Sequence, residues 1–450
     1  MWWLHHFKRR SFMYKEVSKL LLYSNLGEGS ILGNLAGIFE DWEKGAEAAD
    51  KAALTARIYK EIKRILDVST AYGFDTNLWH NYLTFLLISN ENSFTMTCER
   101  VGASEGGSVN IFAKQDFRVF KNLFDFDFGP IEADLGIDCF TTITNYKAIA
   151  KRERVYNKHV SQKVQVLSLK IAAAADEEEI FDLVTEHYRD CGVGLFGINR
   201  AFRIKREGGK LEFIPVNNAD SIRLDDLVGY EYQKKQLVDN TKAFTEGRVA
   251  NNALLYGDAG TGKSTSVRAV LNEYFDKGLR MIEIYKHQFQ DLSDVIAQIK
   301  DRNYYFIIFI DDLSFEEHEI EYKFLKAVIE GGVESRPDNI LIYATSNRRH
   351  LIKETWKDKN DMEFAGEVHR SDTMEEKLSL SARFGVLINY SNPNRQQYHE
   401  IVENLAARAG IEMERDKLLL AANTWELRHG GVSGRTAQQF VNYLAGLQEE

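Results

Sequence analysis

A strand, a glycine-rich loop and a helix follow one another near the middle of this 450-residue chain, and they constrain its fold more than any other feature. Residues 252–256 predict a short buried strand, and residues 265–271 predict a helix. The connecting loop matches the pattern of Gly, any four residues, then Gly-Lys-Ser or Gly-Lys-Thr. It consists of Gly257, Asp258, Ala259, Gly260, Thr261, Gly262, Lys263 and Ser264, and Thr265 follows it. The pattern predicts a loop that binds nucleotide phosphates.

The residue types of this loop suit phosphate chemistry. Glycines let the backbone curl so that successive N–H groups converge on phosphate oxygens, and the following helix adds its positive end. We expect Lys263 to reach the β- and γ-phosphates and the Ser264 hydroxyl to coordinate Mg²⁺. A structural glycine-rich turn before a helix is the alternative, but it does not explain Lys-Ser at this spacing.

Polar side chains follow two further apolar strands. Residues 306–310 are apolar and end in Asp311 and Asp312, and the next strand ends in Asn347. Because ligands bind at the carboxyl ends of parallel strands, we expect these side chains beside the phosphate loop. We predict Asp311 as the Mg²⁺ ligand, Asp312 as the residue that orients the attacking water, and Asn347 as a contact to the γ-phosphate or that water. Helix capping by the acidic pair and a turn role for the asparagine are the alternatives.

Composition limits the class of protein. With 44% hydrophobic and 28% charged residues, the chain is typical of globular proteins and long enough for two or three domains. The net charge of −10 disfavours broad binding to nucleic acid or anionic membranes. Cys98, Cys139 and Cys191 form no CxxC pair, so neither a disulfide framework nor a zinc site is predicted. No secretory signal or membrane-spanning run is evident, and we expect a cytoplasmic protein that does not bind membranes.

Residues 1–220 predict a mainly helical N-terminal domain, in which no catalytic constellation is found. Helical periodicity covers residues 14–22, 53–66 and 177–188. Residues 124–128 alternate Phe and Asp, which predicts a short strand and turn. Asp125 and Asp127 are interpreted as solvent-facing, with a metal site as the alternative. Residues 192–197 predict a tight glycine-rich loop, and residues 177–179 a solvated acidic helix start.

The remaining chain divides into two predicted parts, 221–392 and 393–450. The first alternates strands and helices, which predicts a parallel sheet covered by helices on both faces. Its expected strands are residues 253–256, 281–285, 305–310, 340–344 and 386–390. The second contains three amphipathic helices, at about residues 395–407, 414–428 and 433–447.

This set of motifs resembles the AAA+ ATPases. The resemblance covers roughly half the chain, from about Asp225 to the C-terminus. It implies an αβα sandwich core with a C-terminal helical lid, and ATP with Mg²⁺ as cofactors. It also implies that Arg383 is an arginine finger directed at a neighbouring subunit and that Arg435 is the lid's nucleotide sensor. The loop that would contact adenine contains Leu227, Val228, Gly229 and Tyr230.

Three further segments look like a bacterial AAA+ family with a domain of unknown function, number 815. These segments are residues 226–231, residues 330–332 with 336–339, and residues 344–350. One departure from the AAA+ pattern is Asp312, because most AAA+ enzymes have Glu there. Its shorter side chain predicts slow turnover, or water activation shared with Glu316 or Glu317. No extended pore loop is evident, although Tyr285 and Phe289 are weak candidates.

The expected function is therefore Mg²⁺-dependent ATP hydrolysis that remodels a partner. A finger acting between subunits implies a homo-oligomer, either a ring or a helical array. A protein client is expected rather than nucleic acid. Two alternatives remain open: a nucleic-acid loader, for which Arg348 and Arg349 are candidate phosphate contacts, and a slow nucleotide-gated switch, which Asp312 would permit.

Overall fold

The computed structural model describes residues 13–24, 29–45, 48–103, 107–148, 158–216, 222–316, 319–330, 337–348, 351 and 380–448. The chain forms two compact units, Met1–Asn199 and Arg200–Glu450, and each is considered by itself. The boundary predicted near residue 220 is too late, because the chain enters the sheet of the second unit at residue 201. Within the described residues, no helix has the length and apolar character needed to cross a membrane.

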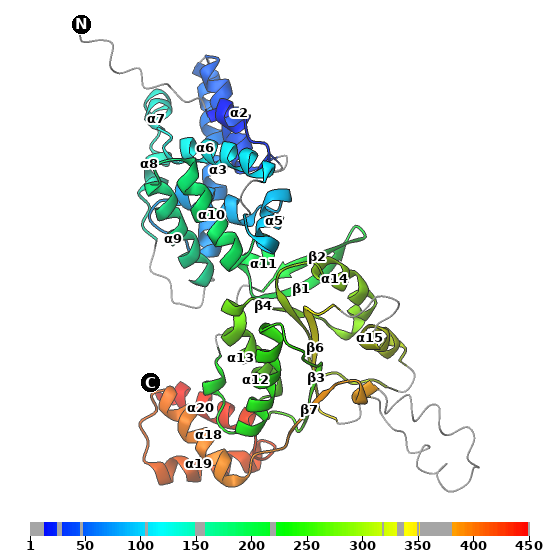
Figure 1. The fold of residues 1–450 in the computed structure, drawn as a ribbon. Helices are drawn as coiled ribbons and strands as arrows, with labels where there is room; N and C mark the ends of the chain where they lie inside the picture. The colour runs from blue at the N-terminus through cyan, green and yellow to red at the C-terminus, as the bar shows by residue number, and fades with distance from the viewer. Residues whose placement is uncertain are drawn as a thin grey trace. The chain divides into compact units, whose positions relative to one another are not determined.

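The described part of the first unit is helical, with one isolated β-bridge between Thr76 and Tyr146. Its helices are α1 (Met13–Val17), α2 (Ile31–Glu43), α3 (Ala48–Tyr72), α4 (Leu78–Ser89), α5 (Ser93–Val101), α6 (Ser108–Phe124), α7 (Gly129–Leu135), α8 (Cys139–Thr144), α9 (Lys158–Ala173), α10 (Glu177–Cys191) and α11 (Gly194–Ile198). Figure 1 shows these helices packed side by side. They enclose one aromatic-rich core, in which Trp79 and Tyr188 are fully buried.

Three local predictions for this unit are wrong. The helix expected over 14–22 ends at Val17, because the buried Asp116 carboxylate accepts the backbone N–H groups of residues 21–23 and turns the chain. The strand expected over 124–128 is absent from the described structure there: α6 extends to Phe124, and Phe128 stacks on Phe140 with ring centroids 4.2 Å apart. Most of the loop expected over 192–197 is instead helical, because the short α11 begins at Gly194.

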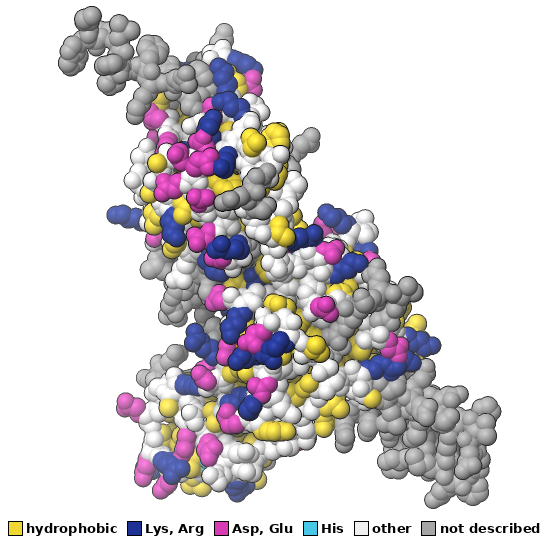
Figure 2. Space-filling model, in the orientation of Figure 1, with side chains coloured by type: hydrophobic (Ala, Val, Ile, Leu, Met, Phe, Trp, Pro, Cys, Tyr) yellow, Lys and Arg dark blue, Asp and Glu magenta, His cyan; other side chains and the backbone are white. Residues whose placement is uncertain are grey.

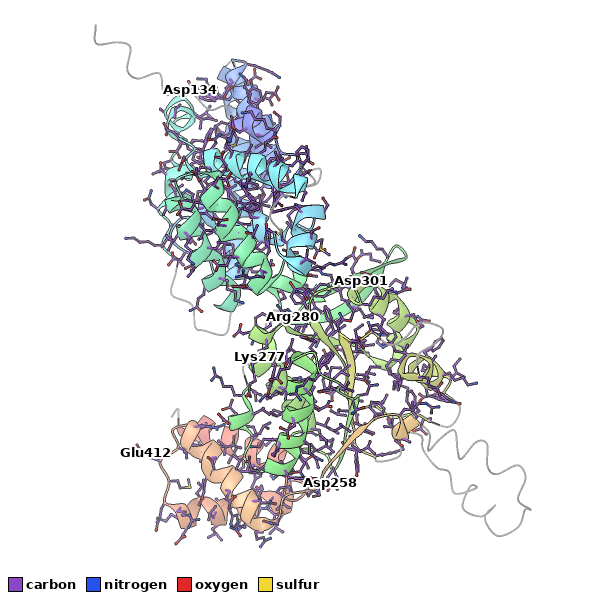
Figure 3. All side chains as sticks on the ribbon, in the orientation of Figure 1. Asp134, Asp258, Lys277, Arg280, Asp301 and Glu412 are labelled. Atoms are coloured by element: carbon purple, nitrogen blue, oxygen red, sulfur yellow. The ribbon has the colours of Figure 1, made fainter. Side chains whose placement is uncertain are left out.

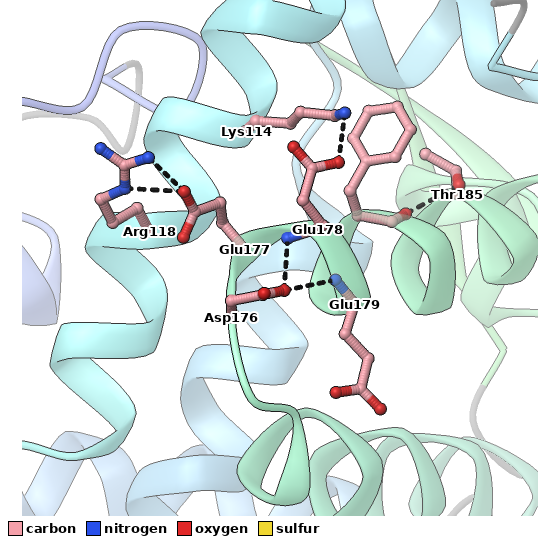
Figure 4. Close-up of polar contacts among 8 residues, drawn as sticks. Lys114, Arg118, Asp176, Glu177, Glu178, Glu179 and Thr185 are labelled. Carbon is pink, nitrogen blue, oxygen red and sulfur yellow. Dashed lines mark hydrogen bonds and ion pairs between the residues drawn. The ribbon is translucent and has the colours of Figure 1, made fainter.

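The acidic start of α10 is ion-paired rather than simply solvated (Figure 4). Asp176 caps the helix by accepting the N–H groups of Glu178 and Glu179 at 3.0 and 3.1 Å. Arg118 and Lys114 of α6 pair with Glu177 and Glu178. The three glutamates therefore favour the helix N-terminus, and Glu177 and Glu178 also join α10 to α6.

The second unit is built on a seven-stranded sheet in the order β2-β1-β4-β5-β6-β3-β7. The strands are β1 (Ala201–Glu207), β2 (Lys210–Pro215), β3 (Ala253–Gly257), β4 (Leu279–Glu283), β5 (Tyr305–Ile310), β6 (Ile340–Ser346) and β7 (Val386–Tyr390). All neighbours pair in parallel except β1 and β2, which form an antiparallel hairpin at one edge. The five expected strands are confirmed, with β4 beginning two residues early, and the hairpin is additional.

Helices cover both faces of this sheet (Figure 1). The helices α12 (Glu231–Thr245) and α13 (Lys263–Tyr274) share a core with alternate residues of the central strands. The helices α14 (Leu292–Ile299) and α15 (Glu321–Glu330) lie on the other side of the strands. Short 3-10 helices cover Leu224–Asp226, Phe275–Lys277 and Lys286–Asp291. We call this αβα sandwich the core.

The last three helices form a separate cluster, which we call the lid. They are α18 (Arg395–Arg408), α19 (Arg415–Arg428) and α20 (Gly434–Gln448), close to the predicted bounds. Their apolar faces meet around the buried residues Tyr398, Val402 and Ala437. The predicted fold class, a parallel α/β core with a helical lid after a mainly helical N-terminal region, is confirmed.

Candidate functional site

The phosphate loop runs from the end of β3 into α13, and its backbone requires glycine at its first position. Gly257 has a φ of +128°, and a Cβ built there would lie 2.1 Å from the carbonyl oxygen of Tyr390. Gly262, at a φ of +88°, stands at the N-cap of α13, where no side chain caps the helix. The first N–H groups of α13 therefore lack a side-chain acceptor at this helix end, which is the arrangement that suits an anion.

Lys263 is directed into the loop. Its side chain is buried, and its ammonium donates to the carbonyl oxygens of Gly257 and Asp258 at 2.8 and 2.6 Å. A third contact, at 3.1 Å, reaches the Oδ1 atom of Asn347. Burial lowers the pKa of Lys263, and the carboxylates of Asp258 and the acidic pair oppose that shift. The ammonium thus lies where a phosphate would meet the loop.

Asp311 accepts two hydroxyl hydrogen bonds on one oxygen. Ser264 and Thr345 both donate to its Oδ1 atom, each at 2.5 Å. A hydroxyl of the phosphate-loop helix and a carboxylate of β5's end therefore meet, as predicted, and these are oxygen ligands of the kind that Mg²⁺ accepts. Thr345 was not predicted, although it lies in the same strand end as Asn347. The described residues contain no group of three or more His, Cys, Asp or Glu arranged for another metal site.

Asp312 has an unusual backbone. Its φ of +51° is in the left-handed region, where Asp and Asn are enriched among non-glycine residues. Its N–H donates to the Thr345 hydroxyl at 3.0 Å, and its Oδ1 atom accepts from the Asn347 amide at 2.8 Å. The backbone geometry gives a physical reason for Asp at a position where Glu is usual, because the shorter side chain tolerates this conformation better.

One cavity of about 990 Å³ contains most of the predicted residues. Its lining is Ile222, Asp226, Leu227, Val228, Tyr230, Ala259, Gly260, Thr261, Gly262, Lys263, Ser264, Thr265, Arg268, Asp311, Asp312, Thr345, Asn347, Ile401, Leu405, Arg408, Ala409, Gly434, Arg435, Gln438 and Gln439. We call it the core–lid cavity. Of the predicted nucleotide contacts, Gly229, Gly257 and Asp258 are outside the lining.

Hydrogen bonds from α18 and from α20 join the lid to the core around this cavity. The N–H of Arg435 donates to the carbonyl oxygen of Gly260 at 3.2 Å, which brings α20 against the phosphate loop. The Arg408 guanidinium, at the end of α18, donates to the carbonyl oxygens of Asp225 and Asp226 at 2.9 and 3.0 Å. Arg408 was missed by sequence reasoning, because nothing in α18 indicates which core turn it meets.

Some of the predicted residues do not line the core–lid cavity. Arg383 does not line the cavity, and it pairs with Glu330 of α15. Glu316 does not line it either, and Glu317, Arg336, Arg349 and His350 lie outside the described residues. Phe289 is buried against Phe315, so it cannot serve as an exposed pore residue, whereas Tyr285 is 41% exposed.

Residues 198–448, more than half of the chain, match the model of the family described as "Protein of unknown function (DUF815)". The chain belongs to this family. The expected resemblance to DUF815 is therefore confirmed.

This DUF815 protein is also similar to parts of longer curated proteins. It is 25% identical over 263 residues to "ATP-dependent zinc metalloprotease FtsH 1" of Conexibacter woesei, a match that covers 56% of this chain and 36% of that protein. It is 39% identical over 75 residues to "Replication factor C large subunit" of Aeropyrum pernix, which covers 16% and 15%. The chain thus spans about a third or less of the length of these relatives.

Among solved structures, a RuvB variant of Thermotoga maritima is 16% identical, with a TM-score of 0.35. The alignment covers 49% of this DUF815 protein and 63% of that chain.

Proposed function

We propose that this DUF815 protein binds ATP with Mg²⁺ in the core–lid cavity and hydrolyses it. The observation that supports this most is the convergence of Lys263, the Ser264–Asp311 pair and the Asp312–Asn347 pair on one cavity. Its volume of about 990 Å³ lies within the range of ligand pockets. A phosphate loop, a hydroxyl–carboxylate pair and a carboxylate–amide pair are together the parts that phosphoryl transfer to water needs.

In this proposal the chain's residues divide the work between binding and water activation. Lys263 exchanges its carbonyl partners for phosphate oxygens, and the N–H groups of α13 bind the same anion. Ser264 and Asp311 hold Mg²⁺, which when bound neutralises charge on the phosphate oxygens. Asp312, held by Asn347, orients the attacking water, and Arg435 contacts the nucleotide from the lid.

The base binds against apolar side chains of the core–lid cavity. Leu227, Val228 and Tyr230 line the cavity from the core, and Ile401 and Leu405 line it from the lid. Because the nucleotide would touch both parts, its hydrolysis changes the angle between core and lid as a hinge.

We further propose a homo-oligomer, a ring or a helical array, that acts on a protein client in the cytoplasm. Arg383 serves as a finger only if it exchanges Glu330 for a phosphate bound by the next subunit. On the face shown in Figure 2, Lys and Arg side chains are mixed with Asp and Glu over the described residues. That mixture supports a protein client better than the phosphate backbone of a nucleic acid, which favours a basic stripe.

A slow nucleotide-gated switch is the second candidate. The Asp312 carboxylate is one methylene shorter than the usual Glu and already accepts the Asn347 amide. Both facts favour a low rate of water activation over a fast motor.

The test is steady-state ATP hydrolysis as a function of protein concentration, together with light scattering with and without ATP and Mg²⁺. Wild type should gain specific activity as larger particles form. Lys263→Ala should lose nucleotide binding, while Lys277→Ala, an exposed lysine just past α13, should behave as wild type (Figure 3). Asp312→Asn should bind ATP without cleaving it, and Arg383→Ala should bind yet lose about 10³-fold in rate if the finger acts.

The outcomes separate the candidates. Binding without turnover in wild type supports the switch, and equal activity at all concentrations removes Arg383 from the mechanism. Nucleic acid that binds with a steep salt dependence would replace the protein client in the proposal. Wild type that binds no nucleotide at all refutes the proposed function.

A further inference from the structure

We propose that Arg268 is a positioning residue that competes with Mg²⁺ for Asp311 and thereby sets how strongly nucleotide binding depends on Mg²⁺. This inference rests on the proposed function, because it concerns the same site.

Arg268 lies one helical turn after Ser264 on α13, so both side chains project from the same face of the helix. Its Nη2 atom is 3.6 Å from the Oδ2 atom of Asp311 and 3.8 Å from the Oε1 atom of Glu283. The side chain is 40% exposed and lines the core–lid cavity. A permanent positive charge is therefore placed between two carboxylates at the predicted metal side of the site.

Both oxygens of Asp311 are engaged in the described structure. Oδ1 accepts the Ser264 and Thr345 hydroxyls, and Oδ2 faces Arg268. A divalent cation that takes this carboxylate must share it with the guanidinium or displace it. The Arg268 charge therefore opposes the cation while it attracts the nucleotide phosphates.

Glu283 gives the guanidinium a second partner. Its Oε2 atom already accepts Arg203 Nε at 2.7 Å and the Tyr285 hydroxyl at 3.3 Å, and its Oε1 atom faces Arg268. This carboxylate is mostly shielded from solvent, with 16% of its side chain exposed. Arg268 can thus remain paired at the end of β4 after Asp311 is taken, which makes the exchange possible without an unpaired buried charge.

Arg268 attracts the nucleotide phosphates but opposes Mg²⁺, so its removal should change nucleotide affinity differently with and without Mg²⁺. The probe is a fluorescent ribose-labelled ADP, titrated into the full-length protein in EDTA and in Mg²⁺. The quantity compared is the ratio of Kd in EDTA to Kd in Mg²⁺. In Arg268→Gln, the affinity in EDTA should fall several-fold and the ratio should rise by about tenfold, since one of the two competing cations is gone.

Two further variants separate charge from structure. Arg203→Gln removes the neighbouring cation of Glu283 and does not touch Asp311, so its ratio should equal that of wild type. Arg268→Lys keeps the charge, and its ratio should stay within about twofold of wild type. A loss of packing alone would weaken binding equally in both buffers and leave the ratio unchanged.

An unchanged or reduced ratio in Arg268→Gln overturns the inference, provided that wild type binds the probe. If Arg268→Gln fails to fold, Arg268→Lys decides: a ratio raised by about tenfold despite the retained charge overturns it. Wild type that binds in neither buffer refutes the proposed function itself, and the two failures are thus distinguished in the wild-type titration.

Discussion

Replacing Asp258 by Ala should loosen the lid. The Asp258 N–H donates to the Tyr390 carbonyl at 2.9 Å, and its carboxylate accepts the N–H of Asn392 at 2.8 Å. Asn392 lies in the short linker between β7 and α18, so this second bond joins the phosphate loop to the start of the lid. A hydrogen bond to a charged acceptor contributes about 1.5–3 kcal/mol when buried, and we take about 1–2 kcal/mol for this exposed pair.

The expected result is weaker nucleotide binding with the core still folded. If the lid samples other positions once the bond is lost, binding must restore the competent one, and about 1–2 kcal/mol corresponds to a 5- to 30-fold rise in Kd. Asn392→Pro should give the same loss, because proline has no N–H to donate. Asn392→Ala keeps the N–H and is the matched control.

The assay is titration with the ribose-labelled ADP in Mg²⁺, with hydrogen exchange of residues 389–394 as a second measurement. The double variant of Asp258→Ala and Asn392→Pro should be no weaker than either single variant, since both remove one bond. Additive losses, or a loss in Asn392→Ala equal to that in Asn392→Pro, would refute the reasoning.

Three further predictions concern stability. Gly257→Ala should lower the free energy of unfolding by about 3 kcal/mol or more, because its Cβ would overlap the Tyr390 carbonyl. Gly209→Ala, whose Cβ would have nothing within 4 Å, should lower it by about 1 kcal/mol. Equal hydrogen-exchange rates of the β3 amides in both variants would contradict this prediction. Burial first, and then the Lys163 charge, lowers the pKa of His187 to about 4, so stability of the first unit should be lost as pH falls from about 6.5 to about 4. The free energy of unfolding of His187→Gln, measured by denaturation at pH 7 and pH 4.5, should not show this loss. Tyr343→Phe should cost about 1–2 kcal/mol in thermal unfolding, since its buried hydroxyl bonds two side chains of α12, and an unchanged midpoint would exclude that contribution.

The strands of the second unit were predictable where they are buried on both faces. Residues 305–310 and 340–344 are continuous apolar runs, which is what a strand between two helix layers requires. The hairpin of β1 and β2 was missed because the apolar residues of its strands are interspersed with exposed charged residues and form no continuous apolar run. Gly208 and Gly209 at its turn were the available signal.

The phosphate side of the site was predictable because its residues are local to the loop or end a strand. Arg268 was within reach of sequence reasoning, since it follows Ser264 by one helical turn. Arg408 was not, because its position depends on how the lid packs on the turn of residues 224–226. The short turn at Asp312 was also unforeseen, since its left-handed backbone follows from the Thr345 contact rather than from local sequence.

The contacts of Lys263 also bear on how the protein would release its product. Its ammonium already holds two carbonyl oxygens of the phosphate loop and the Asn347 amide. A departing phosphate would therefore leave the lysine with partners to return to, and the loop with its shape intact. The lifetime of the product complex should then depend on the apolar base contacts and on the lid, and the emptied protein should be ready at once for another nucleotide.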